Sequence, residues 1–328
     1  MAEASPAAGT VNTVTGPVPA EELGVVAVHE SLLSVYPGAE YGYDVQIDQA
    51  AIFDTLKHKL LAFRQAGGGT IVDSSGMFHG RNVPLYEALA QSTGVHLIAS
   101  TGQGPEALLG GYFLTPQTNP PTPWPAEKFA GLFAGEITEG MVVPRIERRG
   151  TAGLVTTAGT RTGLTPTDAS LFRGAARAAA ETGVAASFRY GADAPAELEL
   201  ILAEGIDPSR TLIGDLDRRH AVAAGYPARL AAAGVFIGID HVGVNHDEEL
   251  LRDEERVELL LELVAAGHAG HIILSSNSTG VAVGHKDNGV TYTAVLEEFI
   301  PAARARGLSE ADARRILIDN PRTLLGGK

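Results

Sequence analysis

The chain has 328 residues, of which 45% are hydrophobic and 20% are charged, the ordinary composition of a globular protein. Its formal net charge is −14, so a surface that wraps a nucleic-acid backbone or lies on an anionic membrane is not expected. Cysteine is absent, which excludes disulfides, cysteine-ligated metals and thiol catalysis.

The first ten residues are rich in Ala, Ser and Pro and have neither the basic nor the apolar region of a signal peptide. We interpret residues 1–10 as a disordered leader and residues 11–328 as one domain. No apolar run reaches the roughly 20 residues that span a bilayer. We therefore expect a cytoplasmic protein that binds a small molecule and has no nucleic-acid or membrane partner.

Eight short apolar runs alternate with longer stretches along the whole chain. They lack strict alternation, as strands buried on both faces do. These runs are Gly24–Val28, Thr70–Val72, His96–Ser100, Gly153–Val155, Ala185–Phe188, Thr211–Gly214, Val235–Ile239 and His271–Ser275. Helical spacing of apolar residues marks Gln49–Ala66, Pro166–Thr182 and Glu248–Ala266. The pattern predicts an α/β protein, a single-domain (β/α)8 TIM barrel, with an open doubly wound sheet as the alternative.

One connection is unusually long. Gly102 to Pro125 is rich in proline and contains the single tryptophan, Trp124. Because it follows the third strand, it is expected over the end of the barrel where active sites lie. A lid over the site and a stiff surface excursion are both compatible with this stretch.

Polar residues stand at or just past the end of every predicted strand. They are His29, Asp73, Thr101, Thr156, Arg189, Asp215, Asp240 and Asn277. Catalytic residues of TIM barrels come from these carboxyl-terminal strand ends. One histidine, one arginine and three aspartates at the same end of the barrel are more charged groups than contact with solvent alone would explain. Several of them are therefore expected to form a functional site.

Several short motifs occur in the order found in a known family. They include Thr13–Pro17, Val28-His29-Glu30, Gly80-Arg81-Asn82, Ala99–Gly102, Glu136–Gly140, Leu164–Pro166 and Asp319-Asn320-Pro321. From about Val11 to Leu325 the chain resembles the phosphotriesterase-related proteins of the amidohydrolase superfamily. The resemblance implies a (β/α)8 barrel with two divalent metals, usually zinc, and a homodimer. It implies as ligands a His-x-His, a carboxylated lysine or a glutamate, two further histidines and an aspartate.

This chain departs from that ligand pattern. His29 is kept, but the other ligand positions hold Ser31, Thr156, Arg189, Asp215 and Asn277. An arginine is a permanent cation in the place of a metal ligand. From these substitutions we expect no cofactor, with a single zinc at His29 and Asp215 as the alternative.

The resulting hypothesis is an enzyme that works by metal-independent acid/base chemistry on a small organic substrate. His29 is the expected general acid/base, Asp215 orients it or acts as a second acid/base, and Arg189 binds an anion or oxyanion. Isomerisation, elimination, cyclisation and ester or lactone opening all fit this set. The expected substrate-binding residues are Ser31, Asp73, Trp124, Thr156, Tyr190, Asn277 and His285. The alternatives are a metal-dependent hydrolase with a reduced or relocated metal site and a non-catalytic small-molecule-binding homologue.

Overall fold

A computed structural model describes residues 9–36, 47–108, 114–115, 122–143 and 147–327. Residues 1–8 of the expected leader lie outside the described part. Part of the expected lid between Gly102 and Pro125 lies outside it too. No described helix is long and apolar enough to cross a membrane.

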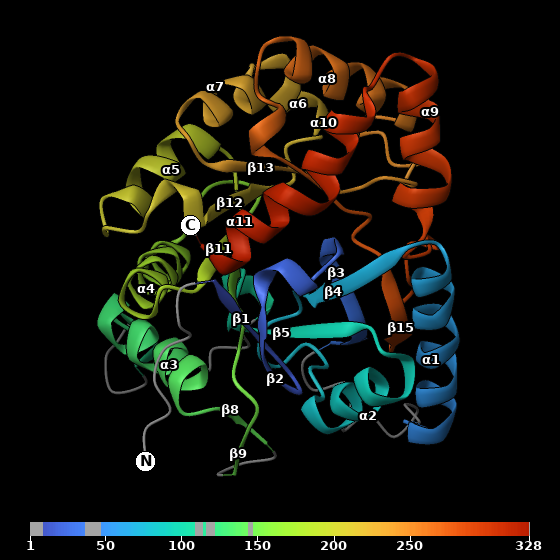
Figure 1. Cartoon of the computed structure of the whole chain (residues 1–328). Helices are drawn as coiled ribbons and strands as arrows, with labels where there is room; N and C mark the ends of the chain where they lie inside the picture. Colours follow the sequence, from blue (N-terminus) through green and yellow to red (C-terminus); the bar gives the residue numbers. More distant parts are fainter. Residues whose placement is uncertain (1–8, 37–46, 109–113, 116–121, 144–146, 328) are drawn as a thin grey trace.

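A curled sheet of parallel strands forms the centre of the molecule (Figure 1). Its order is β14-β13-β12-β11-β10-β5-β4-β3-β15. The strands are β3 (Val25–Val35), β4 (Gly68–Asp73), β5 (His96–Gln103), β10 (Leu154–Ala158), β11 (Ala185–Arg189), β12 (Thr211–Gly214), β13 (Phe236–Ile239), β14 (Ile272–Leu274) and β15 (Thr279–Val283). The first eight are the predicted ones, and the (β/α)8 TIM barrel is confirmed.

The eighth barrel strand is split into two pieces. β14 pairs with β13, whereas β15 pairs with β3, with Thr279 opposite Ser31. Between the pieces the chain turns at Asn277, which has a φ of 47°. The ring therefore closes through β15 at the mouth, directly beside the first strand.

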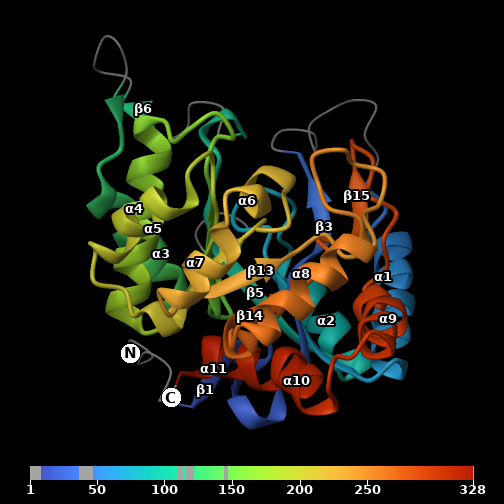
Figure 2. The same ribbon diagram turned by 90° about the horizontal axis from the view of Figure 1, so that it is seen from above.

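Helices cover the outside of the sheet (Figures 1 and 2). They are α1 (Gln49–Gln65), α2 (Val83–Thr93), α3 (Ala126–Thr138), α4 (Pro166–Thr182), α5 (Ala194–Leu202), α6 (Arg219–Ala223), α7 (Tyr226–Ala232), α8 (Asp253–Ala265), α9 (Ile300–Ala305), α10 (Glu310–Arg314) and α11 (Asn320–Gly326). Short π-helical turns, Val295–Phe299 and Arg315–Asp319, lead into α9 and α11. The predicted helix Pro166–Thr182 matches α4 exactly. The predicted helix Glu248–Ala266 corresponds to α8, which begins only at Asp253 because Leu250 forms a β-bridge with Arg218.

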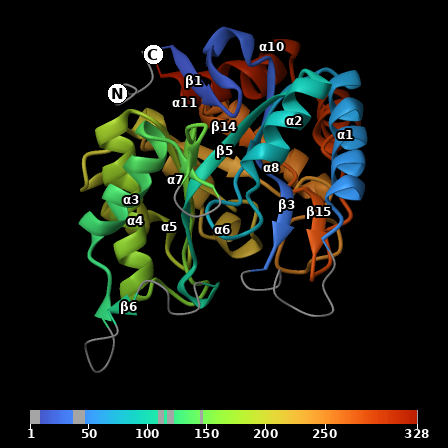
Figure 3. The same cartoon turned by 90° about the horizontal axis from the view of Figure 1, so that it is seen from below.

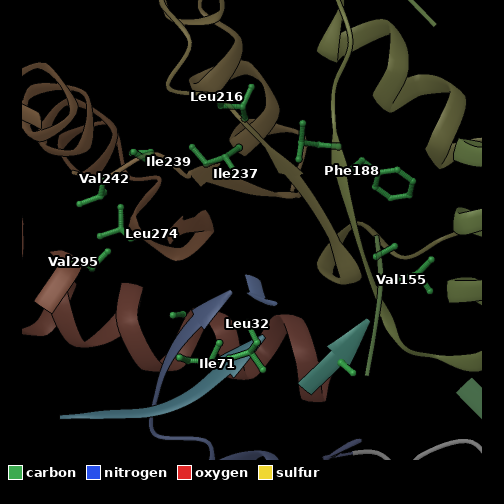
Figure 4. Close-up of a cluster of buried hydrophobic side chains, with 14 of the residues drawn as sticks. Leu32, Ile71, Val155, Phe188, Leu216, Ile237, Ile239, Val242, Leu274 and Val295 are labelled. Atoms are coloured by element: carbon green, nitrogen blue, oxygen red, sulfur yellow. The ribbon is translucent and has the colours of Figure 1, made fainter. Parts of the chain in front are cut away.

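Two apolar clusters hold the layers together. The larger lies between strands and helices, and Figure 4 shows part of it, including Val155, Phe188 and Ile237. The smaller includes one side chain from each of the eight barrel strands: Val28, Val72, Ile98, Leu154, Ala185, Leu212, Phe236 and Ile273. Each strand thus contributes an inward residue, as barrel packing requires.

The two ends of the barrel differ. At one end lie α10, α11 and the hairpin of β1 (Thr10–Thr13) and β2 (Gly16–Pro19), where the Gly9 amide donates to the Gly326 carbonyl at 3.1 Å. The carboxyl ends of β3 and β15 point to the opposite end (Figures 2 and 3). The mouth of the barrel is therefore at that opposite end, where the polar strand-end residues lie.

Candidate active site

A cavity of about 410 Å³ opens at the carboxyl ends of the strands. Six of the predicted site residues line it: His29, Ser31, Thr156, Arg189, Asn277 and His285. Towards this end the interior of the barrel becomes polar, as the strand period of two shows. Two residues beyond the apolar interior layer, the inward positions become polar or glycine: Ser100, Thr156, Ser187, Gly214, Gly238 and Ser275.

His29 lies on the cavity floor between two buried groups. Its Nδ1 is 2.8 Å from Oδ1 of Asp240, and its Nε2 is hydrogen-bonded to the Ser187 hydroxyl. The two atoms are close enough for an ion pair, but their angle does not fit a hydrogen bond. The attraction between them is therefore electrostatic and is strongest when the imidazole carries a positive charge. Asp240, rather than the predicted Asp215, is therefore the carboxylate that faces His29.

Two glycines make room for this pair. A Cβ added at Gly214 would lie 2.7 Å from Cε1 of His29 and 2.7 Å from Oδ2 of Asp240. A Cβ at Gly238 would lie 2.3 Å from the same carboxylate oxygen. Because real Cβ atoms do not come so close, any larger residue at these positions would displace the imidazole or the carboxylate.

Asp215 is neutralised by two arginines. Its carboxylate accepts from Nε of Arg189 at 3.0 Å and from a terminal nitrogen of Arg218. Burial would raise the pKa of Asp215, but Arg189, His241 and Arg218 outweigh it and hold that pKa well below its usual range. An ionised carboxylate locked in this way is a charge partner for Arg189 rather than a second acid/base.

A second His–Asp pair lies behind Asp215. Nδ1 of His241 is 2.8 Å from Oδ1 of Asp217, and its Nε2 is 3.7 Å from Oδ1 of Asp215. Nε of the fully buried Arg256 donates to Asp217 at 2.7 Å. Burial opposes ionisation of Asp217, but His241 and Arg256 lower its pKa to about 2.

Glu30 is a buried carboxyl that also borders the cavity. It accepts the backbone N–H groups of Ser276 at 2.9 Å and Ser278 at 2.6 Å. Burial raises its pKa to about 8, against the lowering effect of these two hydrogen bonds. Glu30 therefore joins β3 to the break in the eighth strand, and its burial favours the neutral form.

The remaining predicted residues lie in different surroundings. His285 stacks on Tyr36 with ring centroids 4.5 Å apart at the cavity wall. Asp73 accepts the Leu32 amide at 2.7 Å and the Tyr86 hydroxyl at 2.9 Å, which are contacts that hold β3 and α2 to β4.

Two aromatic residues of the predicted set are not among the cavity-lining residues. The Tyr190 hydroxyl pairs with Nε2 of His220 at 2.9 Å. Trp124 packs on Phe129, with the Lys128 ammonium 3.5 Å from its ring.

Sequence reasoning missed four participants: Ser187, Asp217, Arg218 and Glu30. Asp240 was recognised as a polar strand end, but nothing identified it as the partner of His29. The period of two along β11 does place Ser187 on the same face as Arg189, and that was the one usable signal.

The backbone is strained at two strand ends. Asp215 has a φ of 62° and Asn277 a φ of 47°, a region that non-glycine residues rarely adopt. Both residues stand at positions that the resemblance assigns to metal ligands. Such outliers are concentrated at functional sites, which supports the mouth as the site.

The donor set at the mouth does not match a two-metal centre. Among the described residues, no three His, Asp or Glu side chains are grouped so that they could hold a metal ion. His29 has both ring nitrogens engaged, and Asp215 is covered by two guanidinium groups.

Comparisons with known proteins agree on one family. The Phosphotriesterase family matches residues 9–325. N-acetyltaurine hydrolase of Tetraodon nigroviridis is 26% identical, over 97% of this chain and 98% of that protein. Aryldialkylphosphatase of Saccharolobus solfataricus is 26% identical, over 93% and 96%. The organophosphorus hydrolase from Deinococcus radiodurans superposes with a TM-score of 0.86 at 25% identity, covering 98% of this chain and 99% of that chain.

These relatives are named as hydrolases, and the family they represent consists of binuclear metal enzymes. The expectation that the protein takes no cofactor is therefore wrong. The match over nearly the whole length shows that the chain belongs to the phosphotriesterase family, a family of hydrolases.

Proposed function

We propose that the protein hydrolyses a small carboxylic-acid derivative, an ester, lactone or amide, that carries an anionic group. One observation carries the proposal: His29, between Asp240 and Ser187, lies on the floor of the same cavity that Arg189 lines. A base with a carboxylate behind it and a cation beside it is suited to acyl transfer. The names of the relatives support hydrolysis as the reaction class.

His29 serves as the general base in this scheme. Water adds to the carbonyl carbon as its proton passes to the Ser187 hydroxyl, which gives its own proton to Nε2 of His29. The Asp240 carboxylate stabilises the imidazolium so formed, because their separation is that of an ion pair. The imidazolium then returns the proton to the leaving oxygen or nitrogen as the carbon–heteroatom bond breaks.

Arg189 holds the anionic group. Its side chain is 33% exposed and is fixed at Nε by Asp215. Its terminal nitrogens have no hydrogen-bond partner within the described part of the chain, so they remain available to the cavity. Paired donors of this kind bind carboxylates and other oxyanions through charge-assisted hydrogen bonds.

The test is a substrate panel of lactones, aryl esters, N-acyl acids and a phosphotriester. Each substrate is assayed both in buffer that contains zinc and in buffer that contains a chelator, so that activity is measured with and without available metal. His29→Gln is compared with His58→Gln, a change at an exposed position of α1. We expect hydrolysis of acidic substrates to fall roughly 10²-fold or more in the first variant only. Equal turnover by the two variants, or a preference for uncharged substrates, would overturn the proposal.

A further inference from the structure

Asn277 presents an amide at the cavity that none of the steps above uses. The residue stands at the break between β14 and β15, lines the cavity and is partly exposed. Its side chain makes no hydrogen bond within the described part of the chain, and neither of its amide atoms is sealed away from solvent. Because an asparagine amide carries two N–H donors, a molecule in the cavity can accept a hydrogen bond from Asn277.

The backbone of Asn277 is held at three points. Glu30 accepts the N–H groups of the two flanking residues, Ser276 at 2.9 Å and Ser278 at 2.6 Å. Nδ2 of Asn288 donates to the Asn277 carbonyl at 2.8 Å. These bonds hold the residue at its φ of 47°, a conformation that few residues besides glycine, asparagine and aspartate adopt readily. The direction in which the side chain leaves the backbone is therefore fixed.

Hydrogen bonds between β3 and the eighth strand place Asn277 close to His29. The His29 N–H donates to the Ser275 hydroxyl at 3.0 Å, and the Ser31 N–H donates to the Ser278 carbonyl at 2.9 Å. Asn277 lies between these two contacts along its strand, and it lines the same cavity as His29. A carbonyl group that is placed for attack beside His29 therefore lies next to Asn277 as well.

Arg189 stands on the other side of the cavity. It ends β11, and between β11 and β3 lie β10, β5 and β4 in one direction around the ring and β12, β13 and the eighth strand in the other. An anionic group at Arg189 and a carbonyl group at His29 therefore occupy opposite sides of the mouth. Holding the anion and activating the carbonyl are separate tasks for different residues.

We propose that Asn277 is a catalytic residue that stabilises the oxyanion formed during hydrolysis. As water adds to the carbonyl carbon, an electron pair of the C=O bond moves to the oxygen, which becomes negative. The Asn277 N–H donates to this oxygen, and the bond strengthens as charge develops, because charge-assisted hydrogen bonds are stronger than neutral ones. The pair returns to the C=O bond as the leaving group departs with the proton from His29. This inference rests on the proposed hydrolysis.

Oxyanion stabilisation and simple substrate binding by Asn277 have different kinetic consequences. A contact that is equal in the ground state and the transition state changes KM, whereas an oxyanion donor changes kcat. Asn277→Gly removes the amide and keeps a residue that adopts positive φ without strain. On the best panel substrate we expect kcat to fall roughly 10²- to 10³-fold, with KM changed no more than about threefold. Gln91→Ala, at an exposed position of α2, should keep both constants.

A binding experiment tests the same role without turnover. The probes are 4-oxopentanoate, 5-oxohexanoate and 6-oxoheptanoate, and for each the methylphosphinate in which phosphorus with two oxygens replaces the ketone carbonyl. The ketones resemble the ground state, and the phosphinates carry negative oxygens on a tetrahedral centre, as the intermediate does. Calorimetry in the two buffers of the substrate panel measures the affinities. For the length that binds best, Asn277→Gly should weaken the phosphinate about 10- to 100-fold and the ketone only a few-fold.

Asn277→Asp separates a hydrogen-bond donor from a residue that only fills space. Aspartate has the same shape and tolerates positive φ, but it offers an anion where the oxyanion needs a donor. It should weaken the phosphinate at least as much as Asn277→Gly does. Arg189→Met should weaken ketone and phosphinate equally, because both carry the carboxylate. Thermal melting of each variant verifies that it is folded.

The outcomes distinguish this inference from the proposed function. An unchanged kcat in Asn277→Gly, or unchanged phosphinate binding by Asn277→Asp, would overturn the role of Asn277 and leave the hydrolase intact. Selective loss of phosphinate binding in Asn277→Gly, in a protein that hydrolyses no panel member, would overturn the hydrolase and leave the oxyanion site intact. If the wild type binds none of the phosphinates, the oxyanion site is rejected as well.

Discussion

His29 and Asp240 meet across the barrel interior, with Nδ1 of the imidazole 2.8 Å from Oδ1 of the carboxylate. His29 lies in β3 and Asp240 directly follows β13, and these two strands are not neighbours in the sheet. Oδ2 of the same carboxylate accepts the backbone N–H of Asp215 at 2.7 Å. Asp240 is thus fixed from one side while it faces the imidazole on the other, which is how a positioning residue for a general base is held.

Asp240→Asn should therefore impair catalysis more than folding. The amide keeps the size of the side chain but removes the charge that stabilises a protonated His29. We expect kcat/KM to fall roughly 10²- to 10⁴-fold, with a small change in melting temperature. The measurement is steady-state kinetics on the best panel substrate beside a thermal melt. Asp54→Asn, at an exposed site on α1, is the matched control, and equal activity of the two variants would remove Asp240 from the mechanism.

The two arginines on Asp215 should differ in what they stabilise. Arg218 is buried, whereas Arg189 is partly exposed at the cavity. Arg189→Met leaves Asp215 paired with Arg218, so we expect weaker binding of acidic ligands and little loss of stability. Arg218→Met removes the buried partner and should cost about 3–5 kcal/mol. Chemical denaturation and ligand titration of both variants test this, and the reverse ranking of stabilities would contradict it.

Local signals in the sequence explain which parts of the fold could be predicted. The helix Pro166–Thr182 could be predicted exactly because the residues next to its two ends determine where it begins and ends. The Thr165 hydroxyl caps the first turn, and Gly183 takes a φ of 74° after the last turn. The eight strands follow from apolar runs buried on both faces. Ring closure through β15 was not predicted, because it depends on Glu30 binding the distant amides of Ser276 and Ser278.

The site was predictable as a place but not as a set of partners. Strand-end positions placed His29, Arg189 and Asp215 at one mouth. Which carboxylate faces His29 depends on the cross-section of the barrel and on the space left by Gly214 and Gly238, and no local pattern encodes this. Arg218 folds back onto Asp215 from three residues along the chain, so the neutralisation of that carboxylate was also not apparent. Whether Trp124, Tyr190 and Asp73 bind substrate stays a prediction.

Arg256 should be a major determinant of stability. It is fully buried, and it bonds Asp217 at 2.7 Å and the Val244 carbonyl at 3.0 Å. Arg256→Met leaves the Asp217 carboxylate with His241 alone, and an underpaired buried charge costs about 3–5 kcal/mol. Urea unfolding should show this loss, whereas Arg229→Met, at an exposed position on α7, should stay within about 0.5 kcal/mol of wild type. A similarly small effect at Arg256 would show that the cluster does not stabilise the barrel.

Glu30 should make the stability depend on pH in a predictable direction. Burial raises its pKa from 4.5 to about 8 in the folded protein. Between these values the unfolded carboxyl has released its proton while the folded one still holds it. Raising the pH across that window therefore favours the unfolded state, by about 1.4 kcal/mol per pH unit for this group. The stabilising effect of the proton is complete below pH 4.5 and is lost as the pH passes through 8.

Glu30→Gln isolates the pH dependence, because the amide does not titrate. At pH 5 the variant should have a lower free energy of unfolding than wild type, by about 1–3 kcal/mol, because the amide nitrogen cannot accept one of the two backbone N–H groups that the Glu30 oxygens accept. It should gain on wild type steadily towards pH 8. Urea unfolding at several pH values measures the difference, and Glu21→Gln, exposed at the other end of the barrel, should show none. If the curves for Glu30→Gln and wild type run parallel from pH 5 to pH 8, Glu30 is ionised throughout and its pKa is not raised.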